Sequence, residues 1–380
     1  MGRLTIHSDS VPMIGLRHRL RRSIAKTAPD FVGLVLARAP KFVYGGKLDT
    51  IPVFTYHRVD ASFEQDLIAL LQGGYRTVGS AQLQEFASGG GKPRERAVAL
   101  TFDDGHISLT EIAAPLLAAH GFVGIAFVVS GLVPPRSSGE LAGWDELRHW
   151  VRLGVLEVGA HSLYHNHVPV RPQVIGFVTP STALGFTADI PVPRLGGSDS
   201  LPLGHPILRG GPRYTVRRAF HPTRDGLARG PELIESEGAA FFSRPDWDHR
   251  LRRAVRIGGR YESFEEADRA VTDDMRESMR LISQHCPNPA ERHFCYPWYA
   301  LDRRTNRLAR LVGADLVYGG VTTASRRGEA DSPPSLQRLP PDFLWRLPGP
   351  RRLHLGTLLA RRVVRAVHGS AFRDIVRSEP

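Results

Sequence analysis

The chain lacks the features that mark disulfide-rich and membrane-spanning proteins. Only 2 of its 380 residues are cysteine, which is too few for a disulfide framework. Cys286 and Cys295 each follow a histidine closely, but the spacing fits no standard zinc cluster, so we expect two buried thiols. No apolar signal segment precedes Arg17, and the best apolar run near the start, 31–37, is too short to cross a bilayer. These absences predict a cytoplasmic location.

The chain also lacks the motifs that accompany nucleic-acid binding. Its 50 Lys and Arg residues outnumber 38 Asp and Glu residues and give a net charge of +12. Such a balance indicates either an anionic partner or simply an Arg-rich codon usage. No zinc-finger spacing, aromatic-rich RNA-binding motif or basic zipper accompanies the charge, so we expect no nucleic-acid partner. With 42% hydrophobic residues, the chain can bury a sizeable core.

The sequence does contain a regular alternation of short apolar runs and longer amphipathic segments. The runs predict strands and the periodic segments predict helices. Strands that alternate with helices at this spacing predict parallel βα units, here a distorted (β/α) barrel of the α/β class, with functional residues at the C-terminal strand ends. The expected strands are 51–59, 97–102, 124–129, 155–160, 293–297 and 314–318, and the expected helices are 63–71, 111–120, 144–153, 266–285 and 302–312.

Composition divides the chain into a barrel with additions. Residues 1–47 are a basic N-terminal extension, and residues 48–345 hold the barrel. A stretch rich in Pro, Gly and Arg, 168–262, breaks the alternation and predicts a long insertion folded as a lid or side lobe. Residues 346–380 read as a basic amphipathic helix followed by a tail.

The C-terminal helix leaves two interpretations open. Leu355, Leu359, Val363 and Val367 recur every fourth residue among arginines. A basic amphipathic helix of this kind can lie on an anionic membrane, which would make the protein membrane-associated. Alternatively, its apolar face packs on the barrel and its charges face water. We favour packing on the barrel.

The first motif with chemical content ends the expected strand 97–102. Asp103, Asp104 and Gly105 follow that strand directly. Neighbouring residues of a strand point in opposite directions, but at a strand end, where the chain turns at a glycine, two adjacent carboxylates can reach one cleft. An Asp-Asp-Gly sequence alone is also a common turn, so this motif needs a partner.

A second motif supplies that partner at the end of the expected strand 155–160. His161 and His165 follow it with an H-x-x-x-H spacing, which places two imidazoles on one face of a helical turn. Two histidines and a carboxylate are a frequent ligand set for a divalent metal ion and leave positions open for water and substrate. The two motifs together predict a metal centre.

In combination these motifs resemble motifs one and two of the polysaccharide deacetylases, the NodB-homology family or carbohydrate esterase family four. Residues 51–59 resemble the opening strand of that family, 144–161 the approach to motif two, and 293–298 the motif-three strand. The resemblance covers about residues 51–167 and 264–340. It leaves out the two termini and the insertion.

The resemblance implies a hydrolase of linear amide C–N bonds that removes an N-acetyl or similar acyl group from a sugar of a polysaccharide or lipid-linked glycan. It implies Asp103 as the general base. Asp104, His161 and His165 would hold one divalent ion, expected to be Zn²⁺, and a water activated by that ion would be the nucleophile. The residues implied to bind the oxyanion or substrate are Tyr296, Pro297 and Trp298, with the backbone N–H of Trp298 as oxyanion donor.

The general acid departs from the pattern of the family. Many members keep a Leu-x-His near the C-terminal end, whereas here the corresponding strand reads Leu336-Gln-Arg338-Leu-Pro340. His57, in the Tyr-His element of the opening strand, matches the acid of members that resemble the poly-N-acetylglucosamine deacetylases. We therefore expect His57 to protonate the leaving amine.

Motif three departs as well. Cys295 stands where many members have an arginine that orients the base. Arg213, Arg292 and Arg338 could each take over that role, and the sequence does not separate them. A divergent, non-catalytic glycan-binding or scaffold protein therefore remains the alternative. Because the insertion follows the second metal histidine, we expect it to act as a lid whose removal alters substrate preference more than metal content.

Overall fold

The computed structural model describes residues 39–90, 96–180, 201–319 and 326–360. The basic run expected near the N-terminus and the second half of the C-terminal helix lie outside these residues.

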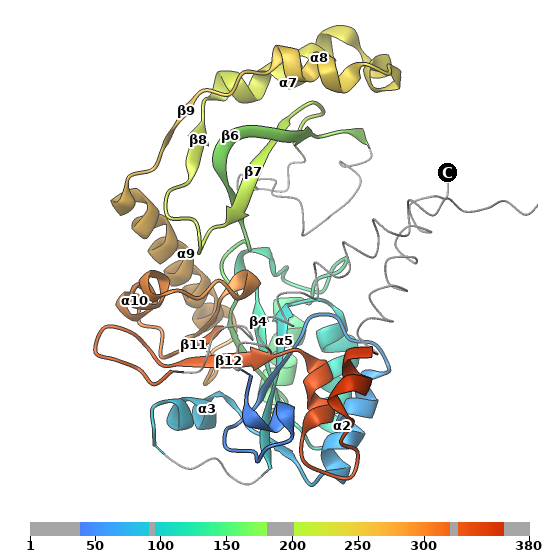
Figure 1. Ribbon diagram of the computed structural model, residues 1–380, viewed down its shortest axis with the longest axis vertical. Coiled ribbons are helices and arrows are strands. Elements are labelled where there is room, and N and C mark those ends of the chain that lie inside the picture. Colours follow the sequence, from blue (N-terminus) through green and yellow to red (C-terminus); the bar gives the residue numbers. More distant parts are fainter. Residues whose placement is uncertain (1–38, 91–95, 181–200, 320–325, 361–380) are drawn as a thin grey trace, which may run out of the picture.

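Seven parallel strands close into a barrel (Figure 1). Closure occurs at β1, which pairs with β12 on one side and with β3 on the other. The two-residue strand β2, Arg76–Thr77, adds to β3 outside the ring. The predicted (β/α) barrel of the α/β class is confirmed. In spatial order the strands of the ring are β1 (Val53–Tyr56), β12 (Ser335–Leu339), β11 (Leu316–Gly319), β10 (His293–Cys295), β5 (Leu156–Ala160), β4 (Gly124–Val128) and β3 (Ala97–Asp104).

Helices connect these strands along the outside of the barrel. The longest, α9, begins at a capping box in which the Ser263 hydroxyl accepts from the Glu266 N–H and the Glu266 carboxylate accepts from the Ser263 N–H. The helices around the barrel are α2 (Phe63–Gln72), α3 (Ser80–Ala87), α4 (Ala114–Ala119), α5 (Trp144–Arg152), α9 (Phe264–His285) and α10 (Arg303–Leu311), with the short turns η1 (Lys41–Tyr44), η2 (Leu109–Ala113), η3 (Ser130–Leu132), η5 (Pro297–Tyr299) and η6 (Pro341–Arg346).

Strand alternation decides which side chains enter the barrel. In β3, Leu100 and Phe102 pack in the outer core beneath the helices, whereas Ala99 packs in the interior. Because the side-chain period of a strand is two residues, Asp103 points into the barrel at its C-terminal end.

Three more residues face the same interior by the same alternation. Cys295 of β10 packs in the inner cluster. Thr55 lies two residues after the inner residue Val53 of β1, and Arg338 lies two residues after the inner residue Leu336 of β12. Closure of the barrel therefore gathers a hydroxyl, a thiol and a guanidinium around Asp103.

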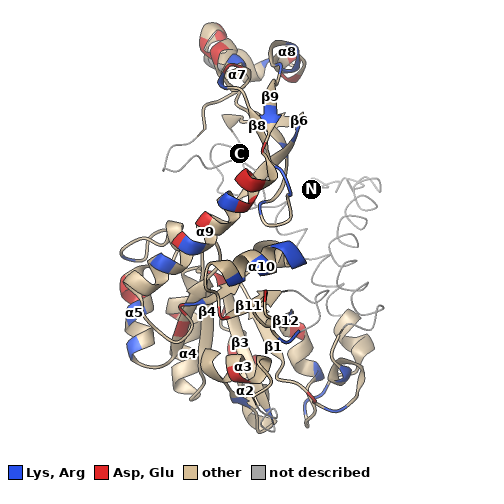
Figure 2. Cartoon of the chain, turned by 90° about the vertical axis from the view of Figure 1, so that its left-hand side faces the viewer, with Lys and Arg blue, Asp and Glu red and all other residues tan. Residues whose placement is uncertain are grey.

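The described part of the segment expected as an insertion forms a lobe above the barrel (Figure 1). The lobe has two antiparallel strand pairs and a small apolar core of its own, made by Phe177, Phe241, Leu251 and Val255. Helix α9 runs from the barrel toward the lobe and carries charges of both signs along its length (Figure 2). The elements of the lobe are β6 (His167–Phe177), β7 (Pro206–Pro212), β8 (Phe220–Pro222), α7 (Arg224–Glu237), η4 (Ala239–Ser243), α8 (Trp247–Ala254) and β9 (Gly259–Tyr261).

The described start of the C-terminal helix, residues 355–360, packs on the barrel. Leu358 is buried there, and Leu355 and Leu359 pack against the same core cluster. Among the residues of known placement, no helix is both long and apolar enough to cross a membrane. The two cysteines are free and buried, which confirms the prediction of two buried thiols.

Candidate functional site

Asp103 lies in a buried, positively charged environment at the C-terminal end of β3. The Nη1 atom of Arg338 donates to both of its carboxylate oxygens, at 2.6 and 2.7 Å, and also to the Thr55 hydroxyl at 2.9 Å. Burial alone would raise the pKa of Asp103, but the charge of Arg338, assisted by His161 and His57, lowers it to about 2. Asp103 is therefore ionised at every working pH.

The same geometry separates the three candidate arginines. Arg338 is fully buried and forms the ion pair with Asp103. Arg213 instead pairs with Glu262 at 2.9 Å, and Arg292 forms a partly exposed pair with Asp315 at 3.2 Å. Arg338 is thus the arginine that orients the carboxylate, and it reaches the position from β12.

Cys295 also contacts the Asp103 carboxylate. Its sulfur lies 3.9 Å from each carboxylate oxygen. Cys295 of β10 and Arg338 of β12 thus face the same carboxylate inside the barrel, and the cation beside Asp103 comes from β12.

Asp104, His161 and His165 meet at the mouth of the barrel. The Oδ1 atom of Asp104 lies 3.4 Å from His161 Nε2 and 3.6 Å from His165 Nε2. This oxygen is buried and has no hydrogen-bond partner among the described residues. Ligands at about 2.0–2.1 Å from a tetrahedral ion lie about 3.3 Å apart, so the three atoms fit around one such ion.

The protonation of the two imidazoles also suits metal binding. Burial lowers the pKa of His161 and of His165 to about 4, so both are neutral at pH 7. The Nδ1 atom of His161 lies 2.9 Å from the Cys295 carbonyl. Since a carbonyl only accepts, Nδ1 carries the proton and Nε2 keeps its lone pair for an ion.

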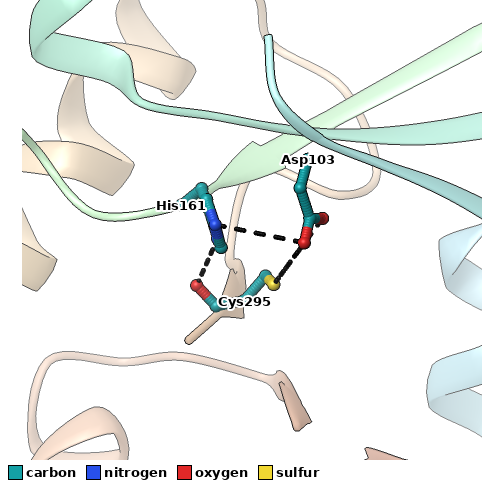
Figure 3. A group of neighbouring side chains, drawn as sticks. All are labelled: Asp103, His161 and Cys295. Carbon is teal, nitrogen blue, oxygen red and sulfur yellow. Dashed lines mark hydrogen bonds and ion pairs between the residues drawn. The ribbon is translucent and has the colours of Figure 1, made fainter. Parts of the chain in front are cut away.

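A second set of possible ligands, drawn in Figure 3, fits an ion less well. It consists of Asp103, His161 and Cys295. Burial raises the pKa of the Cys295 thiol well above its ordinary value, which keeps the sulfur protonated, and both oxygens of Asp103 already accept from Arg338. The set with Asp104 is therefore the candidate metal centre.

The backbone of the site is held in an uncommon conformation. Of six non-glycine residues with positive φ in the described ranges, five lie here. They lie at or shortly after the ends of β3, β5 and β10. The prediction of a helical turn at H-x-x-x-H was wrong: residues 161–166 form an irregular loop. The five residues are Asp104, Ser162, His165, Trp298 and Tyr299.

The remaining predicted residues lie around this centre. His57 Nε2 is 3.9 Å from Asp103 Oδ2, and the side chain is 50% exposed. The Trp298 ring lies 4.0 Å, between centroids, from the ring of His165. Pro297 is buried. Tyr296 is also fully buried, and its hydroxyl donates to the Thr305 carbonyl, so its side chain is not available to a substrate.

Thr55 was missed by sequence reasoning. Its hydroxyl accepts from Arg338 and lies 3.5 Å from Asp103 Oδ2. Its inward position on the strand that precedes His57 was the available signal, but its partner, Arg338, lies 283 residues away in the sequence.

Part of the chain is similar to known polysaccharide deacetylases. Residues 90–183 match the family model described as polysaccharide deacetylase. The poly-β-1,6-N-acetyl-D-glucosamine N-deacetylase of Escherichia coli K12 is 29% identical over 124 residues, which are 29% of this chain and 18% of that protein. The chain therefore matches less than a fifth of its curated relative.

Solved structures with a similar arrangement include the deacetylase domain of BpsB from Bordetella bronchiseptica, with 19% identity, coverage of 77% of this chain and 97% of that one, and a TM-score of 0.49. A de-N-acetylase from Aggregatibacter actinomycetemcomitans has 15% identity, coverage of 82% and 98%, and a TM-score of 0.49. The segment that matches the polysaccharide deacetylase model, residues 90–183, contains both the Asp-Asp and the H-x-x-x-H motifs.

Proposed function

We propose that the chain is a metal-dependent hydrolase that removes an N-acetyl or similar acyl group from a sugar of a polysaccharide or lipid-linked glycan. The observation that carries the proposal is an ionised carboxylate beside a three-ligand metal set. Asp103 Oδ2 lies 4.0 Å from Nε2 of His161, which is one of the ligands. A base and an ion can therefore act on one water molecule.

The low pKa of Asp103 itself favours metal dependence. A carboxylate with a pKa of about 2 cannot take a proton from ordinary water at a useful rate. An ion held by Asp104, His161 and His165 would lower the pKa of water and polarise the acyl carbonyl. Asp103, fixed by Arg338, then accepts the proton without turning away from the reaction centre.

Two further groups complete the reaction. We assign protonation of the leaving amine to His57, whose half-exposed imidazole lies 3.9 Å from the Asp103 carboxylate. The backbone N–H of Trp298, which comes directly after Pro297, is the proposed second donor to the oxyanion, beside the ion. In the overall reaction one water molecule adds to the carbonyl carbon, the C–N bond breaks, and acetate and a free amine are released.

The substrate class follows from the relatives. The curated relative is a deacetylase of poly-β-1,6-N-acetyl-D-glucosamine, so an N-acetylglucosamine polymer is the first substrate to test. Cytoplasmic location, and membrane contact through the basic terminal segments, remain predictions. Fractionation of cells that express the full chain, with and without residues 346–380, would test both.

The decisive experiment pairs metal content with acetate release. We expect one equivalent of metal per chain by mass spectrometry, release of acetate from poly-N-acetylglucosamine oligomers, and loss of that release in Asp103→Asn with the metal retained. Asp104→Ala should lose both. Bound metal without turnover on any acylated sugar would favour the alternative of a non-catalytic glycan-binding protein. If the purified protein binds no metal even after Zn²⁺ is added, the mechanism is refuted.

A further inference from the structure

Asp274 of α9 is attached to the middle of the metal-binding loop. Its carboxylate accepts from the backbone N–H of Leu163, with distances of 3.2 Å to Oδ1 and 3.4 Å to Oδ2. Leu163 lies midway between His161 and His165. Its carbonyl accepts from the Gly131 N–H at 2.8 Å, so both polar backbone groups of this residue are held.

Asp274 is held in turn by a residue of the expected insertion. The hydroxyl of Tyr214, two residues after β7, donates to Asp274 Oδ1. Tyr214 is 1% exposed and belongs to the main barrel core, where its ring packs 5.5 Å from Phe294 and 5.8 Å from Tyr296 between centroids. Its hydroxyl therefore has little freedom to move away from Asp274.

The neighbouring residue fastens this part of the lobe to α9. Arg213 donates to both oxygens of Glu262, at 2.9 and 3.1 Å, and to the Ala267 carbonyl at 2.9 Å. Glu262 directly precedes Ser263, the N-cap of α9. Tyr214 and Asp274 thus belong to one tightly connected unit of lobe and helix.

A second contact joins the lobe to the other end of the same loop. The ring of His167, the first residue of β6, lies 4.1 Å from the Trp298 ring, and Trp298 lies 4.0 Å from the ring of His165. The lobe is therefore connected to the loop in two places, at Leu163 through Asp274 and at His165 through the ring of Trp298.

We propose that Tyr214 and Asp274 are positioning residues for the metal-binding loop, and that through them the lobe sets the affinity of the site for its ion. The proposal rests on the metal site proposed above. The hydroxyl of Tyr214 fixes Asp274, Asp274 fixes the N–H of Leu163, and that bond holds the irregular loop in the conformation that brings His161 and His165 together. Groups that orient metal ligands in this way typically change metal affinity 10- to 100-fold when removed.

This role changes the expectation for segment 168–262. A lid that only covers the cleft would alter substrate preference and leave metal content unchanged. Tyr214 is packed in the barrel core and is connected to the metal-binding loop through Asp274. Loss of its hydroxyl should therefore weaken metal binding, although it removes no side chain of the metal site.

The test measures the Kd of the full-length protein for Co²⁺ and Zn²⁺ by competition with a chromogenic chelator, together with the visible absorption of the Co²⁺ form. Tyr214→Phe keeps the packed ring and removes only the hydroxyl, and Asp274→Ala removes both bonds. Tyr75→Phe is the matched control, because Tyr75 is also a buried tyrosine whose hydroxyl donates a hydrogen bond, here to the Pro348 carbonyl, away from the metal-binding loop.

We expect Kd to rise about tenfold or more in Tyr214→Phe and in Asp274→Ala, with an altered Co²⁺ spectrum. The double variant should be no weaker than Asp274→Ala, because the two residues act in series. Tyr75→Phe should keep the wild-type Kd, because among the described residues its hydroxyl has no connection to the metal-binding loop. A Kd within twofold of the wild-type value in both Tyr214→Phe and Asp274→Ala would overturn the positioning role of these residues. It would leave the proposed metal site itself unaffected. A wild type that binds no ion would overturn both.

Discussion

Replacing Arg338 by methionine would leave the Asp103 carboxylate buried without its cation. Both side chains are almost fully inaccessible, at 0% and 2% exposure. The pKa of Asp103, lowered from 3.8 to about 2, corresponds to about 2.5 kcal/mol in favour of the ionised form at 1.36 kcal/mol per pKa unit. Removing one partner of a buried pair typically costs about 3–5 kcal/mol, because the other charge remains desolvated. We expect Arg338→Met to fall in that range at pH 7.

The pH dependence gives the reasoning a second check. In the wild type, the lowered pKa of Asp103 stabilises the fold above pH 3.8, and this contribution is lost as the pH falls through about 2. In Arg338→Met, burial without the cation raises the pKa of Asp103 above 3.8. The variant therefore loses most free energy of unfolding, relative to the wild type, at pH 7. This loss should become smaller as the pH falls toward 4.

The assay is urea unfolding of metal-free protein at pH 7 and pH 4.5. Arg292→Met is the matched control, because its pair with Asp315 is 56% and 31% exposed and such pairs contribute about 0–1 kcal/mol. Adding Asp103→Asn to Arg338→Met should recover part of the lost stability. If Arg338→Met lowers the free energy of unfolding no more than Arg292→Met does, Arg338 does not stabilise the buried Asp103 carboxylate. The same conclusion holds if the loss is equal at both pH values.

Three further substitutions test separate parts of the site. His57→Asn should lower acetate release about 10²- to 10⁴-fold with unchanged metal content; equal turnover would remove His57 from the mechanism. Burial raises the pKa of Asp274 from 3.8 to about 6, so the wild type should lose stability as the pH rises from about 4 to about 6, and urea unfolding of Asp274→Asn should show a flatter profile. Gly105 has φ +75°, and an added Cβ would lie 3.2 Å from Val128; Gly105→Ala should therefore cost at least about 1–2 kcal/mol in the same assay, and a neutral result would argue against this turn.

The barrel and the two main motifs were within reach of sequence reasoning. Apolar runs separated by amphipathic segments predict parallel strands, and parallel strands bring their C-terminal ends to one side. That rule alone is enough to bring Asp104 and His161 together from two strands. The predicted helix 266–285 agrees with α9, Phe264–His285. The start of this helix is a local feature of the sequence, because Ser263 and Glu266 form a capping box.

The supporting groups depended on contacts between distant parts of the chain. Arg213, Arg292 and Arg338 look alike in sequence, and only the pairing of β12 with β1 places the last of them against Asp103. The H-x-x-x-H spacing is compatible with a helical turn, but the structure has a loop there, held by tertiary bonds such as the one from Leu163 to Asp274.

The sequence by itself therefore indicated the candidate site residues, because the strands follow a periodic pattern and the Asp-Asp and H-x-x-x-H motifs directly follow two of them. The tertiary structure alone decided how those residues are held. Closure of the barrel brought Arg338, and neither Arg213 nor Arg292, against Asp103. Tyr214 lies more than 40 positions after the metal-binding loop in the sequence, and the lobe places it against Asp274, which holds that loop. Such choices depend on which side chains share a buried volume, and that is settled only when the barrel closes.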